Sequence, residues 1–144
     1  MSLMVGLASE HFIVTDLAKA GIPSFITPHL MRYDVVADIF GKLCRIQVKA
    51  TSQPLLRDSR RPSWRFRLTR GIGHSKTYKP DDFDFLAFVC LATSEVAYVP
   101  ANELVGTSVT FTPSDRAKPA NNPSARHFSD YPLSKLLDQL KGAA

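Results

Sequence analysis

Apolar residues recur at helical intervals near the beginning of the chain. Over residues 3–20 they predict a helix that ends at Gly21, with Pro23 just beyond it. Its expected apolar stripe consists of Leu3, Leu7, Val14 and Leu17. Glu10 falls within that stripe, where a carboxylate is costly unless something pairs with it. Glu10 is therefore a candidate metal ligand or partner of a buried base. The alternative is a glutamate at the stripe's edge that reaches water.

Two alternating segments, residues 33–38 and 43–49, predict a β-hairpin with Phe40-Gly41 at its turn. A two-residue turn places Asp34 opposite Gln47. One face is then wholly apolar and holds Val35, Ala37, Cys44, Ile46 and Val48. The other face is polar and holds Asp34, Asp38, Arg45, Gln47 and Lys49. A slip of one residue would mix the two faces, so the pattern favours this register.

Three further strands are expected. Residues 64–68 alternate aromatic residues with arginines, residues 83–92 are strongly apolar, and residues 95–99 follow after a turn at Thr93-Ser94. Trp64 and Phe66 are interpreted as core residues on the face opposite the arginines.

The remaining segments are loops and a closing helix. Residues 51–62 and 71–76 predict loops, and residues 112–129 are rich in Pro, Asn and Ser and predict irregular structure. The closing helix is predicted by Leu133, Leu136, Leu137 and Leu140. The order helix, strands, helix indicates an α/β fold of the α+β sandwich type, with a central mixed β-sheet flanked by helices.

Composition limits the class of protein. The chain has 144 residues, of which 44% are hydrophobic, so we expect one globular domain over residues 1–144 rather than a disordered or fibrous chain. Neither a membrane span nor a secretory signal is expected, which predicts a cytoplasmic protein. Two cysteines, Cys44 and Cys90, are too few for a disulfide framework or a zinc site and are interpreted as buried core residues.

Positive charge is concentrated in one part of the chain. The formal net charge is +5 and the pI about 9.4. Residues 42–79 hold eleven Lys and Arg residues and a single acid, Asp58. Such a block suits a polyanion, because neutralised phosphates release counterions. The alternative is a solvated basic face. The candidate DNA-binding residues are Arg57, Arg60, Arg61, Arg65, Arg67 and Lys76.

The polar hairpin face carries groups that suit a metal-dependent nuclease, which needs oxygen ligands around a divalent ion and a nearby cation. Asp34 would be a bridging metal ligand. Gln47 would offer its side-chain carbonyl to the metal, and Val48 its backbone carbonyl. Lys49 would orient or help to deprotonate the attacking water and stabilise developing charge. Glu10 would contribute a further carboxylate from the preceding helix.

Asp34 followed by Gln47-Val48-Lys49 in a hairpin, after Gly6-x-x-Ser9-Glu10 in a helix, resembles the PD-(D/E)xK endonuclease superfamily. Its group I intron-associated (homing) branch, in which the third motif reads Q-x-K, is most similar. Residues 46–51 and 82–89 look like that branch's most recognisable stretches. Two departures are that no proline adjoins Asp34 and that Gln47 removes one negative charge, which Glu10 could restore.

The resemblance implies a restriction-endonuclease-like core with Glu10 and Asp34 as metal ligands and Mg²⁺ as cofactor, with Mn²⁺ as a substitute. It also implies double-stranded DNA as substrate, hydrolysis by an activated water, and a homo-oligomer, either a dimer or a tetramer, that cuts both strands.

Two other functions remain open. One is a catalytically inactive nuclease-fold module that still binds DNA, and the other is a basic interaction protein whose hairpin charges form ordinary salt bridges. Several residues are given structural interpretations. Asp38 is expected to be a turn or solvent residue, and Tyr78, Asp82 and Asp84 to have structural or DNA-proximal roles. The four histidines show no metal-ligand spacing.

Overall fold

The computed structural model describes residues 3–28, 30–52, 63–70, 76–77, 81–104, 106–115, 117–118, 122 and 124–142, with the backbone alone for residues 69, 70, 76 and 77. Most of the two predicted loops over residues 51–62 and 71–76 therefore lies outside the described residues, as does Tyr78.

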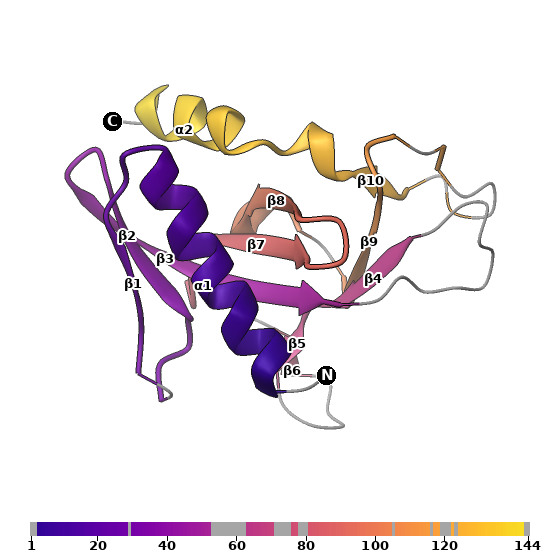
Figure 1. The fold of residues 1–144 in the computed structure, drawn as a ribbon, viewed down its shortest axis with the longest axis horizontal. Helices are drawn as coiled ribbons and strands as arrows, with labels where there is room; N and C mark the ends of the chain where they lie inside the picture. The colour runs from indigo at the N-terminus through magenta and orange to yellow at the C-terminus, as the bar shows by residue number, and fades with distance from the viewer. Residues whose placement is uncertain are drawn as a thin grey trace.

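A five-stranded sheet forms the centre of the molecule (Figure 1). Its strands are β1 (Ser24–Ile26), β2 (Val35–Ile39), β3 (Lys42–Thr51), β7 (Phe85–Cys90) and β8 (Glu95–Pro100), in the order β1-β2-β3-β7-β8. The β3–β7 pair is parallel and the other pairs are antiparallel. The prediction of a central mixed sheet is confirmed.

The β2–β3 hairpin has the predicted register, with Val35 paired to Ile46. Its turn places Phe40 at φ 55° and Gly41 at φ 82°. Positive φ at both central residues defines the type I′ turn, whose twist matches that of the flanking strands. Glycine adopts this conformation without a steric penalty, whereas Phe40 does so because the hairpin on either side fixes it.

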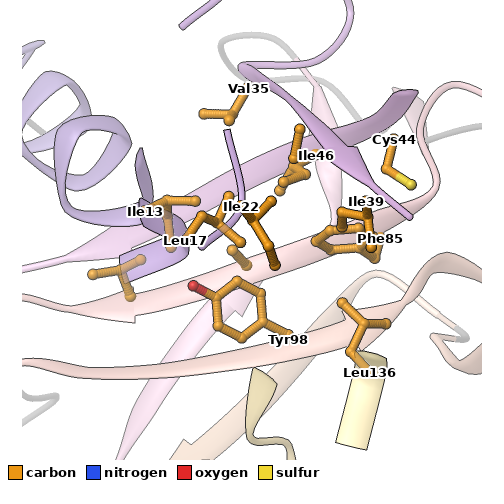
Figure 2. Close-up of a cluster of buried hydrophobic side chains, with 13 residues drawn as sticks. Ile13, Leu17, Ile22, Val35, Ile39, Cys44, Ile46, Phe85, Tyr98 and Leu136 are labelled. Carbon is orange, nitrogen blue, oxygen red and sulfur yellow. The ribbon is translucent and has the colours of Figure 1, made fainter. Parts of the chain in front are cut away.

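Helices α1 (Leu3–Lys19) and α2 (Leu133–Gly142) pack over one face of this sheet. In Figure 2, Ile13 and Leu17 of α1 lie close to Ile46 and above the ring of Tyr98. The same core contains the apolar hairpin face that the sequence predicts, and it includes Val35, Ala37, Cys44, Ile46, Phe85, Ala87, Val89, Tyr98 and Leu136, with Val48 packed against it. The predicted closing helix is confirmed.

The face of α1 that enters the core differs from the predicted stripe. Leu3 is 75% exposed and Leu7 is 42% exposed, whereas Ser9, Ile13 and Leu17 are buried. Ser9 fits there because it is small and because its hydroxyl donates to the Val5 carbonyl (2.8 Å). The prediction that Leu3 and Leu7 belong to the core is therefore wrong.

A second, smaller sheet covers the opposite face. Its strands are β4 (Trp64–Arg67), β9 (Ser108–Thr112) and β10 (Arg126–His127), in the order β10-β9-β4. Aromatic side chains fill the space between the two sheets, where the Phe66 and Phe88 rings lie 5.1 Å apart. All six residues of β7 are buried because the strand is covered on both faces, which explains its unbroken apolar run.

The remaining described elements are short. They are β5 (Thr69–Arg70), β6 (Lys76–Thr77) and the 3-10 helices η1 (Ala101–Glu103) and η2 (Phe128–Asp130). Lys76 was predicted to lie in a loop but lies in β6, where it pairs with Arg70 of β5. Thr51 likewise extends β3 through its pairing with Cys90.

The alternation predicted for residues 64–68 is confirmed, since Trp64 and Phe66 are buried and Arg65 and Arg67 are exposed. Strands β1 and β9 were not predicted, and the short β10 and η2 occur where irregular structure was predicted. The strand predicted over residues 83–92 is shorter at both ends in the structure, where β7 covers Phe85–Cys90.

Both cysteines are free and buried, as predicted, with Cys44 2% and Cys90 0% exposed. Burial also raises the pKa of the Cys44 thiol, which disfavours the reactive thiolate. We expect neither thiol to react with Ellman's reagent in the native protein. Both should react in about 6 M guanidinium, which unfolds most stable domains. Rapid reaction of a thiol under native conditions would contradict this packing.

A side-chain hydrogen bond joins α1 to β8, an edge strand of the five-stranded sheet. The Tyr98 hydroxyl donates to the Asp16 carboxylate (2.5 Å), and burial together with this bond raises the pKa of Tyr98. Tyr98→Phe should lower the free energy of unfolding by about 1–2 kcal/mol, because a bond to a charged acceptor is lost. Urea denaturation measures this loss, and unchanged stability would contradict it.

Candidate functional site

The candidate site lies where β3 continues beyond the end of β2. Strand β2 pairs with β3 only as far as the Val35–Ile46 pair, whereas β7 follows β3 on its other side from Ile46 to Thr51. Among the described residues no strand takes the place of β2 beside this last part of β3. Asp34, the residue before β2, stands at the start of this open edge.

The Asp34 carboxylate satisfies the backbone that β2 leaves unpaired. The backbone N–H of Asp34 donates to the Ile46 carbonyl (2.9 Å). The carboxylate Oδ2 of Asp34 accepts hydrogen bonds from the Val48 N–H (2.8 Å) and from Gln47 Nε2 (2.8 Å). The N–H and C=O of one strand residue point to the same side of the strand. The Val48 carbonyl therefore points to the open edge where Asp34 lies.

The hydrogen bonds also orient the Gln47 amide. Asp34 Oδ2 already accepts from the Val48 N–H, so it acts as an acceptor, and the donating nitrogen of the Gln47 amide must face it. The Gln47 Oε1 atom, which the sequence predicts as a metal ligand, consequently points away from this contact.

Lys49 shares the polar face of β3 with Gln47, because side chains two residues apart in a strand lie on one side. It is half-buried. Burial lowers the pKa of Lys49, although the nearby Asp34 carboxylate opposes that shift. Burial also raises the pKa of Asp34, while the Val48 N–H and Lys49 act against it. Perturbed pairs of this kind are typical of functional sites.

Glu10 is half-buried on α1, beside the buried row that contains Ser9 and Ile13. That helix packs against β3 more than against any other strand. The structure thus brings Asp34, Gln47, Val48 and Lys49 together and places Glu10 on the helix that covers the same strand. Ligation by Glu10 stays a prediction.

The predicted DNA-binding residues divide into two groups. Arg65 and Arg67 project from β4, on the second sheet and not on the strand that carries Lys49, and both side chains are exposed. Arg57, Arg60 and Arg61 lie outside the described residues, as does the side chain of Lys76.

Two arginines near the site were not among the predicted site residues. Arg32 precedes Asp34 by two residues, and Arg45 lies on β3. Arg32 Nη1 donates to the buried Asp82 carboxylate (3.0 Å), and Arg45 pairs with Asp84 through Nε (3.5 Å). The structural interpretation of Asp82 and Asp84 fits these contacts. Arg32 could not be identified from the sequence, because its partner is fifty residues away.

The oxygen-bearing groups near the open edge suit a hard divalent cation by type, and Gln47 would have to turn its amide to present Oε1 to an ion beside Asp34. These groups are the Asp34 carboxylate, the Gln47 amide oxygen and the Val48 carbonyl, and such oxygen ligands suit Mg²⁺ or Mn²⁺. The part of the chain that the structure describes contains no group of three or more His, Cys, Asp or Glu side chains that could hold a metal. An ion here would therefore depend on amide and backbone oxygens in addition to carboxylates.

Comparisons with known proteins agree with this architecture. No curated protein matches the chain. Among solved structures, the bacterial homing endonuclease I-Ssp6803I matches with a TM-score of 0.70 at 20% identity, over 97% of this chain and 94% of that one. The predicted restriction-endonuclease-like fold is thereby confirmed. A family model described as PD-(D/E)XK endonuclease matches residues 4–134, and this protein belongs to that family.

Proposed function

We propose that the protein is a metal-dependent DNA endonuclease that hydrolyses phosphodiester bonds with a metal-activated water. The observation that carries the proposal is the open edge of β3, where Asp34 is hydrogen-bonded to both Gln47 and Val48 and lies near Lys49. The family and the homing endonuclease with the same fold support it.

The metal would be Mg²⁺, with Mn²⁺ as a substitute, held by the Glu10 and Asp34 carboxylates, Gln47 Oε1 and the Val48 carbonyl. When bound, such an ion lowers the pKa of a water ligand and polarises the phosphate. Lys49 orients the attacking water and stabilises the charge that develops on the phosphate oxygens. Its lowered pKa makes the neutral amine, which can accept a proton, more accessible than in an exposed lysine.

Double-stranded DNA is the proposed substrate. The net charge of +5 and the exposed Arg65 and Arg67 support a polyanionic partner. Assembly into a dimer or tetramer and a single domain over residues 1–144 stay predictions. No helix among the described residues is long and apolar enough to cross a membrane, and a cytoplasmic location also stays a prediction.

A second candidate function is a DNA-binding module that has lost cleavage. Gln47 favours it, because an amide replaces the acid that this motif position usually holds and so weakens a cation site. Glu10, Asp34 and Lys49 favour the nuclease, since a site without selection for cleavage would tend to lose at least one of them.

Lys49→Ala and Asp34→Asn should each reduce cleavage of supercoiled plasmid in Mg²⁺ or Mn²⁺ by about 10²–10⁴-fold, because each removes a group that acts on the reaction rather than on binding. DNA affinity in EDTA should stay within a few-fold of the wild type. The measurement is conversion of plasmid to nicked and linear forms over time.

Lys42→Ala and Asp38→Asn are the matched controls, since both residues are exposed on the same hairpin and should leave cleavage unchanged. Full cleavage by both Lys49→Ala and Asp34→Asn would refute the assignment. Binding by the wild type without cleavage of plasmid or genomic DNA would favour the inactive module.

Gln47→Glu should change how the protein responds to metal. Gln47 Nε2 now donates to Asp34 across 2.8 Å, and a second carboxylate at that distance adds like-charge repulsion in the metal-free protein. We expect a lower Tm than the wild type in EDTA and a larger rise in Tm with millimolar Mn²⁺, because a ligand that binds only the folded state stabilises it. Equal Mn²⁺ shifts in both proteins would argue against metal binding at Gln47.

A further inference from the structure

Arg32 is held in place by a carboxylate that is nearly inaccessible to solvent. Its Nη1 lies 3.0 Å from Asp82 Oδ1, and the Asp82 side chain is 4% exposed whereas that of Arg32 is 58% exposed. A buried carboxylate is costly unless it is paired, and Arg32 pairs with it here. The guanidinium is thus oriented from its buried side, while its exposed part carries further N–H donors.

Arg45 is oriented in the same way by the same segment. Its backbone N–H donates to Asp84 Oδ2 (2.7 Å), and its Nη1 donates to the Asp81 carbonyl (2.8 Å). The guanidinium carbon lies 5.9 Å from the centre of the Tyr33 ring, and the side chain remains 37% exposed. Residues 81–84, which lead into β7, therefore hold both arginines.

Both arginines lie at one end of the candidate site. Arg45, Gln47 and Lys49 lie on one face of β3, and residues two apart along a strand are separated by about 7 Å. Arg32 precedes Asp34 by two residues, and Tyr33 lies between them. Arg45 therefore continues the row of polar groups on the side away from Lys49. The Arg32 guanidinium is held near that end of the row, because its partner Asp82 precedes Asp84, the partner of Arg45, by two residues.

Stability alone gives little reason for the Arg45–Asp84 pair, whereas the Arg32–Asp82 pair also compensates a buried carboxylate. The Arg45–Asp84 pair has a 3.5 Å contact and both side chains are more than one third exposed, and pairs of that kind contribute little to folding. Arginine fixed by a carboxylate on one side is, however, well suited to phosphate, because its planar group presents several donors in a fixed geometry and loses little freedom on binding.

We propose that Arg32 and Arg45 form a phosphate clamp that holds the DNA backbone next to the phosphate to be cut, with Asp82 and Asp84 as the residues that position the two guanidinium groups. This proposal rests on the proposed function for its substrate. Arg32 and Arg45 would thus be two DNA-backbone contacts near the proposed cation site, separate from Arg65 and Arg67 of β4.

The test measures binding of a mixed-sequence 40-base-pair duplex in EDTA over a range of salt concentrations, with Arg32→Gln and Arg45→Gln. Each variant should bind about tenfold more weakly at low salt. Each should also lower the slope of log affinity against log salt by about 0.9, the value for one phosphate contact. Unchanged affinity and slope in both variants would overturn the clamp.

Arg126→Gln is the matched control. Arg126 also lies over a tyrosine ring, that of Tyr131 at 5.4 Å, but it belongs to β10 of the second sheet. The Arg126→Gln substitution removes the same charge and should reduce DNA affinity and the salt slope less than Arg32→Gln or Arg45→Gln does. An equal loss of affinity and slope in all three variants would indicate a general charge effect and would also overturn the clamp.

Asp84→Asn separates positioning from charge. Removing an acid makes the protein more positive, so electrostatic attraction alone predicts tighter DNA binding, whereas loss of the group that orients Arg45 predicts weaker binding with an unchanged Tm. Tighter binding would contradict the positioning role. These binding assays use no metal. A wild type that binds DNA but does not cut it with Mg²⁺ or Mn²⁺ would therefore refute the proposed cleavage, while the Arg32→Gln and Arg45→Gln results would still decide whether the two arginines hold the DNA backbone.

Discussion

The difference in length between β3 and β2 is the constraint on which the site depends. Because β2 begins at Val35, which pairs with Ile46, the backbone of β3 after Ile46 has to be satisfied by something other than β2 on that side. The Asp34 carboxylate does so, through the Val48 N–H, and in doing so it comes within hydrogen-bond distance of Gln47. The same interaction that completes the sheet therefore assembles the candidate ligands.

Burial gives this edge its chemical character. Desolvation raises the pKa of Asp34 and lowers the pKa of Lys49, so the charged form of each group is less favoured than on an exposed surface. Two such groups side by side do not improve the stability of a fold, since replacing a buried pair by apolar residues is often neutral or stabilising. Folding alone therefore does not require these two half-buried groups on the polar face of the hairpin, and the proposed reaction gives them a role.

Two layers cover the faces of the central sheet, and the site residues Asp34, Gln47 and Lys49 stay partly exposed at its edge. Helices α1 and α2 cover one face and the second sheet covers the other, so β7 is fully buried between two cores. The segment that leads into β7 holds both Arg32 and Arg45. One strand entry thus serves both the packing of the interior and the placement of positive charge next to the candidate site.

The sequence by itself determined the hairpin, its register and the grouping of Asp34, Gln47, Val48 and Lys49, because these depend on alternation and a two-residue turn within sixteen residues. It also predicted both helices and the burial of Cys44 and Cys90. Only the tertiary structure decided which face of α1 is buried, that β9 joins β4 in a second sheet, and that Asp82 meets Arg32. Those outcomes depend on contacts between distant segments, and local periodicity carries no information about them.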